Sequence, residues 1–551
     1  MRHLILILFS SFNVFVLCAQ KPRNTDSTTS VKIIQTYKPT LIEARKIETV
    51  PVIEKPKPVA PNYTYTIEPK KVKTDKTVSN IPAADLYKTE EFNYPSSFVK
   101  VGYGNMKTPL AEFYLNNKRD NKYSYGVQYR FLQTNSELNK TFADFTMHNA
   151  KGYLASYSTN GEFGLEASYK QNKFNYYGYK DTSKIAEKNL GRTISNFEAK
   201  AYFNSVSDKS NKVKHRTAFK FYNYQIGGAI ENDYALSSKI YSKVSDFNDL
   251  ENGVLSATVG FDYTTFQYLN QKSFNRIFLT LDPRFDFKYD VLNVSAGLNT
   301  TVYFNGSDTA RPFINPFIKV TYPLIENVAT IYGGIDGRYN KQSLKSIIQT
   351  NQFVSNYNLT NTYENIKLFA GITAKVGSSA DAVFEINYSD VTNMPLYIST
   401  HDTFNSFTII NDQANILKFT AAFNYSFSEV ARIGFTGNFY NYDFKTQPQP
   451  WQLPTIDGKI NMKFNIKNKV YPHFDVMAMS LQKQRTGVSE TNYSTNTINA
   501  FYDISAGIDF RFRPKLSLFV QANNIMSSRY QRWYNYPVYG FNAIGGLTFI
   551  F

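Results

Sequence analysis

Cysteine and tryptophan are almost missing from this chain, which has one Cys and two Trp among 551 residues. A single cysteine cannot form a disulfide within the chain, which excludes the small disulfide-stapled scaffolds of secreted proteins. Charged residues make up 19%, below the roughly 25% usual for soluble domains. Beyond the N-terminus no apolar run comes near 18 residues, so the sequence predicts no membrane-spanning helix.

The N-terminus has the pattern of an export signal. Met1-Arg2-His3 precede an apolar run over 4–17, and the small residue Ala19 follows. This order is typical of a secretory signal peptide over 1–19, cut after Ala19. A lipoprotein signal at Cys18 is the alternative, but the bulky Leu17 stands where such signals have a small residue. We therefore expect an exported mature chain without cysteine.

Aromatic residues, by contrast, are abundant: 42 Tyr and 45 Phe bring their share, with Trp, to 16%. Apolar and polar residues alternate in long runs, as in INAFYDISAGIDFRFRP (498–514), LKFTAAFNYSF (417–427) and KINMKFNIK (459–467). These runs reach the roughly 9–11 residues that a tilted strand needs to cross a bilayer. Apolar and polar residues on opposite faces are typical of a strand between lipid and a wet lumen. A secreted β-sandwich array is the alternative, but its strands would be about 5–6 residues long.

The connections favour a membrane barrel, because short turns alternate with longer polar loops when the chain is read back from Phe551. The predicted short turns lie at 117–121, 160–161, 208–212, 326–327, 378–381, 428–430 and 513–516. Outer-membrane barrels have short periplasmic turns and long outward loops, so a periplasmic C-terminus puts all of these turns on the periplasmic side. We predict an all-β fold, a closed antiparallel transmembrane β-barrel over 96–551 with about 22 strands, within roughly 18–22. The stretch 104–109 is either a turn or a bulge.

The chain ends on the apolar strand YGFNAIGGLTFIF (539–551), in which Phe541, Leu547, Phe549 and Phe551 share one parity. Chain termini are usually polar and frayed. A final strand that closes the barrel and faces lipid explains an apolar end. We expect these four residues to form the C-terminal signal that the outer-membrane barrel assembly machinery recognises.

Residues 20–95 have a different character, with prolines recurring from Pro39 to Pro82 among Lys and Glu. This composition favours extended polyproline geometry and a semi-rigid spacer. The segment is either a plain periplasmic leader, or it lies in the lumen or reaches a periplasmic partner. Val31, Ile33 and Ile34 are the candidates for an edge strand that pairs with such a partner through main-chain groups.

The final strands carry a pattern found in one family. The matching residues are Asn523, Asn524, Tyr530, Tyr536, Pro537, Gly540 and the terminal Phe551. In these residues the chain resembles the C-terminal end of a TonB-dependent receptor barrel, except that Phe541 stands where the family has an arginine. The resemblance covers the barrel and implies a receptor-like protein of the Gram-negative outer membrane.

The resemblance does not extend to the N-terminal part. Members of that family carry a folded plug domain before the barrel. Here only 20–95 precede the first predicted strand, and they lack the glycine-rich, compact character of a plug. The resemblance therefore implies a receptor-like barrel without a full plug, with TonB or another periplasmic protein as a possible partner.

The formal net charge is +17, from 61 basic and 44 acidic residues. In an outer-membrane barrel, rim lysines can pair with phosphates of lipopolysaccharide; alternatively, the excess lines a solvated lumen. Lys459, Lys463 and Lys467 alternate along one predicted strand and would form an anion-attracting stripe if that face is lumenal. Because the basic residues are spread among membrane strands, the sequence predicts no nucleic-acid partner.

Catalytic signals are scarce. The histidines left after signal cleavage, His148, His215, His401 and His473, form no metal-ligand spacing, and no glycine-elbow serine motif is present. We predict no catalytic, metal-binding or cofactor-binding residues and no enzyme. The predicted function is a receptor or transport barrel of the outer membrane; a non-transporting accessory barrel of a larger outer-membrane complex and a passive channel are the alternatives.

Overall fold

The computed structural model describes residues 97–117, 120, 122–138, 141–178, 191–205, 213–244, 250–269, 273–306, 310–377, 379–400 and 406–551. The chain divides into two units, Met1–Lys88 and Thr89–Phe551, and all described residues belong to the second. The predicted signal peptide and the segment 20–95 therefore lie outside the described residues, and the boundary at 95/96 stays a prediction. Within the described residues, no helix is long and apolar enough to cross a membrane.

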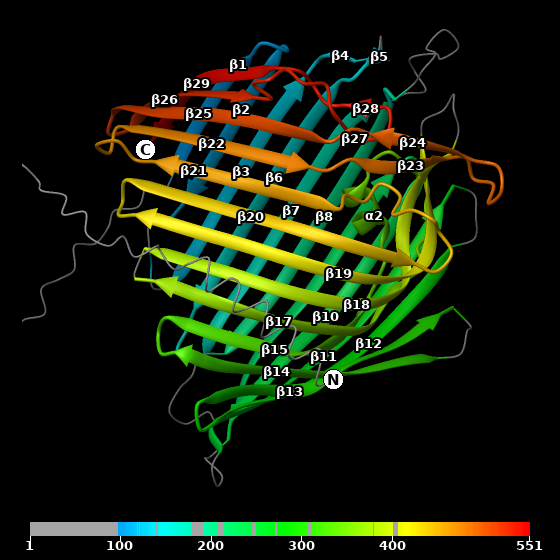
Figure 1. The fold of residues 1–551 in the computed structure, drawn as a ribbon. Coiled ribbons are helices and arrows are strands. Elements are labelled where there is room, and N and C mark those ends of the chain that lie inside the picture. The colour runs from blue at the N-terminus through cyan, green and yellow to red at the C-terminus, as the bar shows by residue number, and fades with distance from the viewer. Residues whose placement is uncertain are drawn as a thin grey trace, which may run out of the picture. The chain divides into compact units, whose positions relative to one another are not determined.

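The second unit is a closed antiparallel β-barrel of 22 strands (Figure 1). Its first half consists of β1 Ser97–Gly104, β2 Thr108–Asn116, β3 Tyr123–Thr134, β6 Phe145–Tyr157, β7 Gly161–Asn175, β8 Gly191–Ser205, β9 Val213–Ile226, β10 Ala229–Lys243, β11 Leu250–Tyr268, β12 Phe274–Tyr289 and β13 Leu292–Asn305. Its second half consists of β14 Arg311–Ile325, β15 Ala329–Asn340, β17 Thr362–Val376, β18 Ala380–Ser399, β19 Phe407–Phe427, β20 Ala431–Phe444, β21 Ile456–Phe464, β22 Val470–Met479, β25 Phe501–Arg513, β26 Leu516–Asn523 and β29 Asn542–Ile550. The predicted fold class and strand number are confirmed.

Smaller elements lie in the connections between the barrel strands. They are β4 Glu137–Leu138, β5 Thr141–Phe142, α2 Leu344–Thr350, β16 Val354–Asn356, β23 Gln482–Thr486, β24 Ser494–Ile498, β27 Gln531–Trp533 and β28 Tyr536–Pro537. All of them belong to connections at the end of the barrel opposite the C-terminus. The same end of the barrel therefore carries the larger loops.

The ring closes where the last strand meets the first. β29 pairs antiparallel with β1, from Phe98 opposite Ile550 to Gly104 opposite Ile544. Gly102 and Gly546 face each other in this ladder, and a Cβ on Gly546 would lie 2.0 Å from the carbonyl oxygen of Val101. Because closure pairs both edges, no strand edge is left open to hydrocarbon.

The alternating sequence pattern separates lipid from lumen. On β20, Phe435 and Phe439 are 41% and 45% exposed on the outer wall, whereas the side chain of Asn438, of the other parity, donates a hydrogen bond to Asp457 at 2.9 Å on the lumenal face. The same arrangement recurs around the ring, where large exposed apolar side chains occupy the outward parity. An apolar exterior and a polar interior are the features of a transmembrane barrel, so the protein is placed in the outer membrane.

The predicted short turns lie at one end. The connections 158–160, 326–328, 428–430 and 514–515 all lie at the end where the chain terminates at Phe551. The stretch 104–109 holds the turn between β1 and β2, which lies at the opposite end and has Lys107 in the left-handed region at φ 48°. We therefore call the C-terminal end periplasmic and the opposite end extracellular.

One part of the predicted pattern is wrong, because the extracellular connections are not all long. β9 and β10 are joined by Gly227 and Gly228 alone, and 269–273 and 306–310 are also short. The connection 341–361 is long by contrast, and it contacts Glu198 of β8, Glu231 of β10 and Arg276 of β12.

Candidate functional site

A 21-residue connection over 341–361 enters the extracellular mouth, and we call it the strap. It links β15 to β17 and contains α2 and β16. Ser343 caps the helix: its side chain accepts the amide hydrogen of Ser346, and the Ser346 hydroxyl accepts that of Ser343. The Glu231 carboxylate on β10 accepts the amide hydrogen of Leu344 at 2.9 Å. An acidic group suits a helix N-terminus, where unpaired amides and the helix dipole favour negative charge.

Lysine side chains tie the strap to the barrel wall. Lys341 Nζ lies 2.7 and 2.8 Å from the two carboxylate oxygens of Asp262 on β11 and also contacts Asp233 on β10. Lys345 Nζ lies 2.5 Å from Glu198 Oε1 on β8. These two lysines thus pair with three lumenal carboxylates, which come from strands that do not adjoin the root of the strap.

A buried ion pair lies in the wall beneath the strap. Arg276 on β12 and Glu231 on β10 are 3.4 Å apart, and their side chains are 2% and 0% exposed. Arg276 also donates to the carbonyl oxygens of Gln342 at 2.7 Å and Leu359 at 3.3 Å. Buried charges require such partners, because an unpaired ion in a low-dielectric interior is costly.

The other side of the strap is aromatic, and Phe353 is at its centre. Its ring stacks on Tyr536 with centroids 3.6 Å apart and planes at 17°. Phe174 and Tyr177 approach the same ring edge-on, both at 5.8 Å. Phe174 lies near the end of β7, and the other three rings come from the connections after β7, β15 and β26. Burial raises the pKa of Tyr177, so its hydroxyl stays neutral inside this aromatic cluster.

The residues that carry the family resemblance brace the connection between β26 and β29. Asn524 is buried, has φ 45°, and donates to the carbonyl oxygens of Ser528 and Tyr539, both at 2.7 Å. Tyr530 stacks on Phe501 at 4.0 Å. Tyr536 and Pro537 form β28, and the amide after Gly540 donates to Ser527. This pattern thus positions Tyr536 against Phe353.

The structure separates the three lysines of the predicted stripe. Lys459 and Lys463 lie on the lumenal face of β21, opposite Thr436 and Arg432 of β20. Lys467 lies in the turn after β21, with φ 53°. The predicted stripe therefore has two members on the strand, and the third lies at the periplasmic end.

The other predicted site residues fall in two groups. Leu547 and Phe549 lie on the outward face of β29 at 45% and 49% exposure, and Phe541 and Phe551 flank that strand. Their role as an assembly signal stays a prediction. Val31, Ile33 and Ile34 lie outside the described residues.

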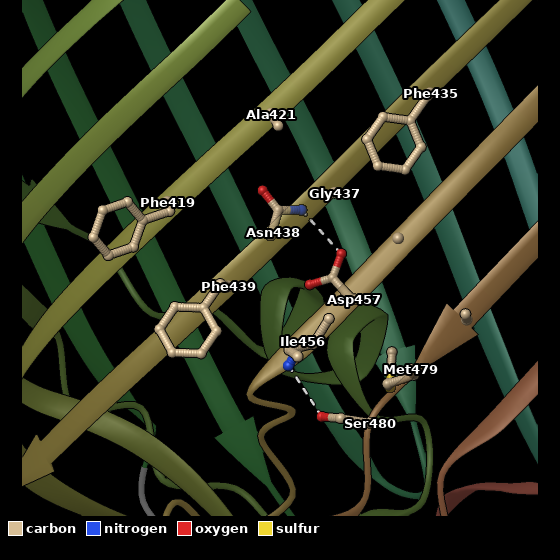
Figure 2. Close-up of a pocket in the computed structure, with 12 residues that line it drawn as sticks. Phe419, Ala421, Phe435, Gly437, Asn438, Phe439, Ile456, Asp457, Met479 and Ser480 are labelled. Carbon is tan, nitrogen blue, oxygen red and sulfur yellow. Dashed lines mark hydrogen bonds between the residues drawn. The ribbon is translucent and has the colours of Figure 1, made fainter. Parts of the chain in front are cut away.

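A hollow of about 600 Å³ lies on the outer wall (Figure 2). Its floor is a row of small residues in register across four strands, and that row is Ala421, Gly437, Gly458 and Ala478. Phe419, Phe435 and Phe439 form its sides (Figure 2). The exposed lining is almost wholly apolar and faces lipid. Of the polar residues that line it, Asn438 bonds to Asp457 and Ser480 accepts the amide hydrogen of Ile456, so little remains to orient a solute.

Sequence reasoning missed the strap, although a signal for it was present. Leu344, Ile347 and Ile348 repeat at helical spacing within a loop that otherwise reads as polar, and all three are buried. No local signal marks Glu231, Arg276 or Phe353, because their partners are remote in the sequence. No group of three or more metal-ligating side chains occurs among the described residues.

Comparisons with known proteins identify the fold. No protein-family model and no curated protein sequence matches this chain. Among solved structures, it is similar to the ferric-catecholate import receptor Fiu of E. coli K12, with TM-score 0.63, 8% identity, and coverage of 83% of this chain and 82% of that one. The siderophore receptor PirA of Acinetobacter baumannii gives TM-score 0.65, 11% identity and coverage of 83% and 80%. The pyoverdine outer membrane receptor FpvA of Pseudomonas aeruginosa gives TM-score 0.64 and 9% identity, with coverage of 83% of this chain and 78% of that one.

At these identities the likeness concerns the fold. It agrees with the resemblance in the C-terminal strands and with the number of strands in the ring. The described part of this chain is a 22-stranded transmembrane barrel with the fold of outer-membrane siderophore receptors.

Proposed function

We propose that this protein is an outer-membrane receptor or transport barrel of the TonB-dependent type that works without a full plug domain. The observation that carries the proposal is the closed barrel with a polar lumen, in the fold shared with siderophore receptors. In this proposal residues 20–95 occlude the lumen in part or contact the periplasmic energy-coupling protein. Val31, Ile33 and Ile34 supply the contacting strand.

The relatives indicate which cargo to test first. Fiu imports ferric catecholates, and such complexes carry net negative charge. Lys459 and Lys463 on the lumenal face of β21 would attract an anion along its path. We therefore propose anionic metal chelates as the first cargo class for binding measurements on the full chain.

The test is a direct binding measurement with TonB. A peptide spanning 26–45 should bind TonB, and Ile34→Pro should abolish binding because proline removes a main-chain donor needed for strand pairing. A scrambled peptide of the same composition is the control. Absence of binding by the natural peptide would refute energised uptake through this segment.

A second candidate is a non-transporting accessory barrel of a larger outer-membrane complex. The specific observation in its favour is the joining of three mouth connections at Phe353, which obstructs a solute path. Stoichiometric copurification with other outer-membrane proteins, together with no conductance in planar bilayers, would support it. A large open conductance that rises on deletion of 20–95 would instead support a passive channel.

A further inference from the structure

We infer that the lumenal face of β8, β9 and β10 binds an elongated solute that carries two phosphate groups or a chain of them. The site consists of two pairs of basic side chains, and these are Lys200 with Lys220 and Arg216 with Lys239. The inference goes beyond the proposed function, and it stands whether or not the protein engages TonB. It rests on the register of the strands, on the partners of the nearby carboxylates and on the shape of the wall between the two pairs.

The strand register places basic residues directly opposite one another. Lys200 on β8 is the ladder partner of Lys220 on β9. Arg216, four residues before Lys220 on the same strand, is the ladder partner of Lys239 on β10. Side chains at directly opposite positions have Cβ atoms about 5 Å apart, and like charges there destabilise a sheet. The wall thus holds two unfavourable pairs that a bound anion would stabilise.

All four side chains lie on the lumenal face. On β9 and β10 they share the parity of Tyr222 and Glu231, whose side chains form a hydrogen bond of 2.9 Å inside the barrel. On β8, Lys200 has the parity opposite to that of Phe197, which is 41% exposed on the outer wall. The two pairs therefore face the lumen and not lipid.

At several other places in the lumen, charges at directly opposite positions are complementary. Ladder partners of opposite sign that also form ion pairs are Glu112/Arg130 at 3.0 Å, Glu166/Lys200 at 2.9 Å and Glu251/Lys288 at 3.4 Å. Asp381 likewise stands opposite Lys375. The wall of β8–β10 departs from this arrangement, and a ligand that supplies negative charge accounts for the departure.

The carboxylates beside the site already have partners. Glu166 pairs with Lys200 and with a lysine of β6, and Glu198 pairs with a lysine of the strap. Glu162 accepts the hydroxyl hydrogen of Tyr202 at 2.8 Å. Among the ion pairs between residues that the structure describes, none includes the other three cations of the site, and all three are exposed. These cations thus have no acidic group within ion-pair distance there.

The wall between the two pairs is open. Its ladder positions hold Ala218 on β9 and Ser237 on β10, with Gly260 next to them on β11. Tyr202 on β8 is the large neighbour, but its ring leans away over β7, where a Cβ on Gly164 would lie 2.1 Å from it. An extended molecule can therefore lie along β9 and reach both pairs, which are four residues or about 13 Å apart.

The charge of each pair suits a phosphate group. A phosphate monoester carries roughly two negative charges at pH 7, which matches two cations, whereas a carboxylate carries one. The planar guanidinium of Arg216 can donate to two oxygens of such a group, and the lysines add point charges. The two separated pairs therefore fit a solute with two phosphate groups or a polyphosphate chain.

A further ladder pair of like charge lies across the lumen. Arg432 on β20 stands opposite Lys463 on β21. β9 is the seventh and β21 the eighteenth barrel strand, so they are eleven strands apart in the ring of 22. Basic side chains on facing walls raise the electrostatic potential between them, which favours the entry of a polyanion.

The test is the binding of short-chain inorganic polyphosphate to the full-length barrel in detergent, measured by isothermal titration calorimetry. We expect Lys220→Gln/Lys239→Gln, which removes one cation from each pair, to raise the dissociation constant at least about tenfold, because each phosphate loses a charge-assisted contact. Absence of polyphosphate binding by the parent barrel would overturn the inference.

Lys288→Gln/Lys375→Gln is the matched control. It makes the same change in net charge by removing two lumenal lysines that stand opposite Glu251 and Asp381. It should change the dissociation constant by less than about twofold, since salt screens distant charges. An equal loss of affinity in this control would show attraction by the whole lumen and would overturn the site.

Competition separates phosphate from other anions. Orthophosphate, which reaches only one pair at a time, should bind far more weakly than polyphosphate. Polyglutamate that binds more tightly than polyphosphate would overturn the phosphate assignment and would indicate an acidic protein segment as the ligand.

Stability without ligand tests whether the cations are structural. Because like-charge repulsion is relieved, Lys220→Gln/Lys239→Gln should unfold at the same urea concentration as the parent or a higher one. Polyphosphate should stabilise the parent and not this variant. A variant less stable than the parent in the absence of polyphosphate would show that these lysines have stabilising partners in the barrel, and it would overturn the site.

Discussion

Phe353 and Tyr536 stack with ring centroids 3.6 Å apart, although one ring is rooted between β15 and β17 and the other between β26 and β29. The stack joins two sectors of the mouth that share no strand pairing. It also links the part of the sequence with a family pattern, which contains Tyr536, to the strap, for which no family pattern was identified.

The contributions of Phe353 and Tyr536 to the free energy of unfolding should be coupled. In a double-mutant cycle with Phe353→Ala and Tyr536→Ala, we expect a coupling energy of about 1 kcal/mol beyond the loss of buried area. Native-state hydrogen exchange at the amide of Phe407, which donates to the Phe353 carbonyl oxygen at 3.1 Å, reports the free energy of local opening at this contact. Strict additivity of the two single changes would contradict this expectation.

The buried ion pair should matter far more than an exposed one. We expect Glu231→Gln to lower the free energy of unfolding by roughly 3–5 kcal/mol, because Arg276 is left charged and buried. Glu251→Gln is the matched control: Glu251 pairs with Lys288 at the same 3.4 Å, with side chains 60% and 41% exposed, and should cost at most about 1 kcal/mol. Guanidinium unfolding in detergent micelles measures both. Similar losses would show that Glu231 is not buried as described.

Adjacent residues on β20 test the two faces of the wall. Phe435→Arg places a charge in lipid and should cost about 2–4 kcal/mol of folding free energy near the bilayer centre. Thr436→Arg places the same charge in the lumen and should cost far less. Folding titrations into lipid vesicles measure the difference. If the lumenal variant were the more damaging one, the assignment of inner and outer faces would be wrong.

The lumenal lysines should set ion preference. We expect Lys459→Glu/Lys463→Glu to shift the reversal potential in a salt gradient toward cation selectivity, because two fixed positive charges in the lumen become negative. The measurement uses the reconstituted full-length barrel. Lys467→Glu changes charge only at the periplasmic turn and should have a smaller effect. A shift of equal size from that control would argue against a β21 stripe.

The ladder between β29 and β1 should tolerate alanine at Gly545 but not at Gly546. A Cβ on Gly546 would lie 2.0 Å from the Val101 carbonyl oxygen, whereas the nearest atom to a Cβ on Gly545 is 3.6 Å away. Gly546→Ala should therefore prevent pairing of β29 with β1, because backbone cannot move aside without breaking the ladder. Gly545→Ala should fold normally. The heat-dependent gel mobility of the folded barrel reports closure, and normal mobility of Gly546→Ala would contradict the prediction.

Several features of the barrel could be predicted from local sequence. The runs around Phe419 and Phe510 alternate because each strand separates two different solvents, and such a period-two pattern needs no knowledge of remote residues. The same holds for the periplasmic turns such as 428–430. The pattern is reversed at the end of β9 for a physical reason: Tyr224 and Ile226 face the lumen and are buried near the strap, whereas Gln225, of the outward parity, is polar and exposed.

By itself, the sequence determined that this chain forms a closed barrel between lipid and water. Apolar residues for the lipid face and polar residues for the lumen alternate along each strand, so the pattern is local. Tertiary structure alone decided where the strap lies. Lys341 meets Asp233 and Asp262, and Phe353 meets Tyr536, only after the ring has closed and brought remote strands together. Contacts of that kind have no periodicity along the chain, so no local pattern could predict them.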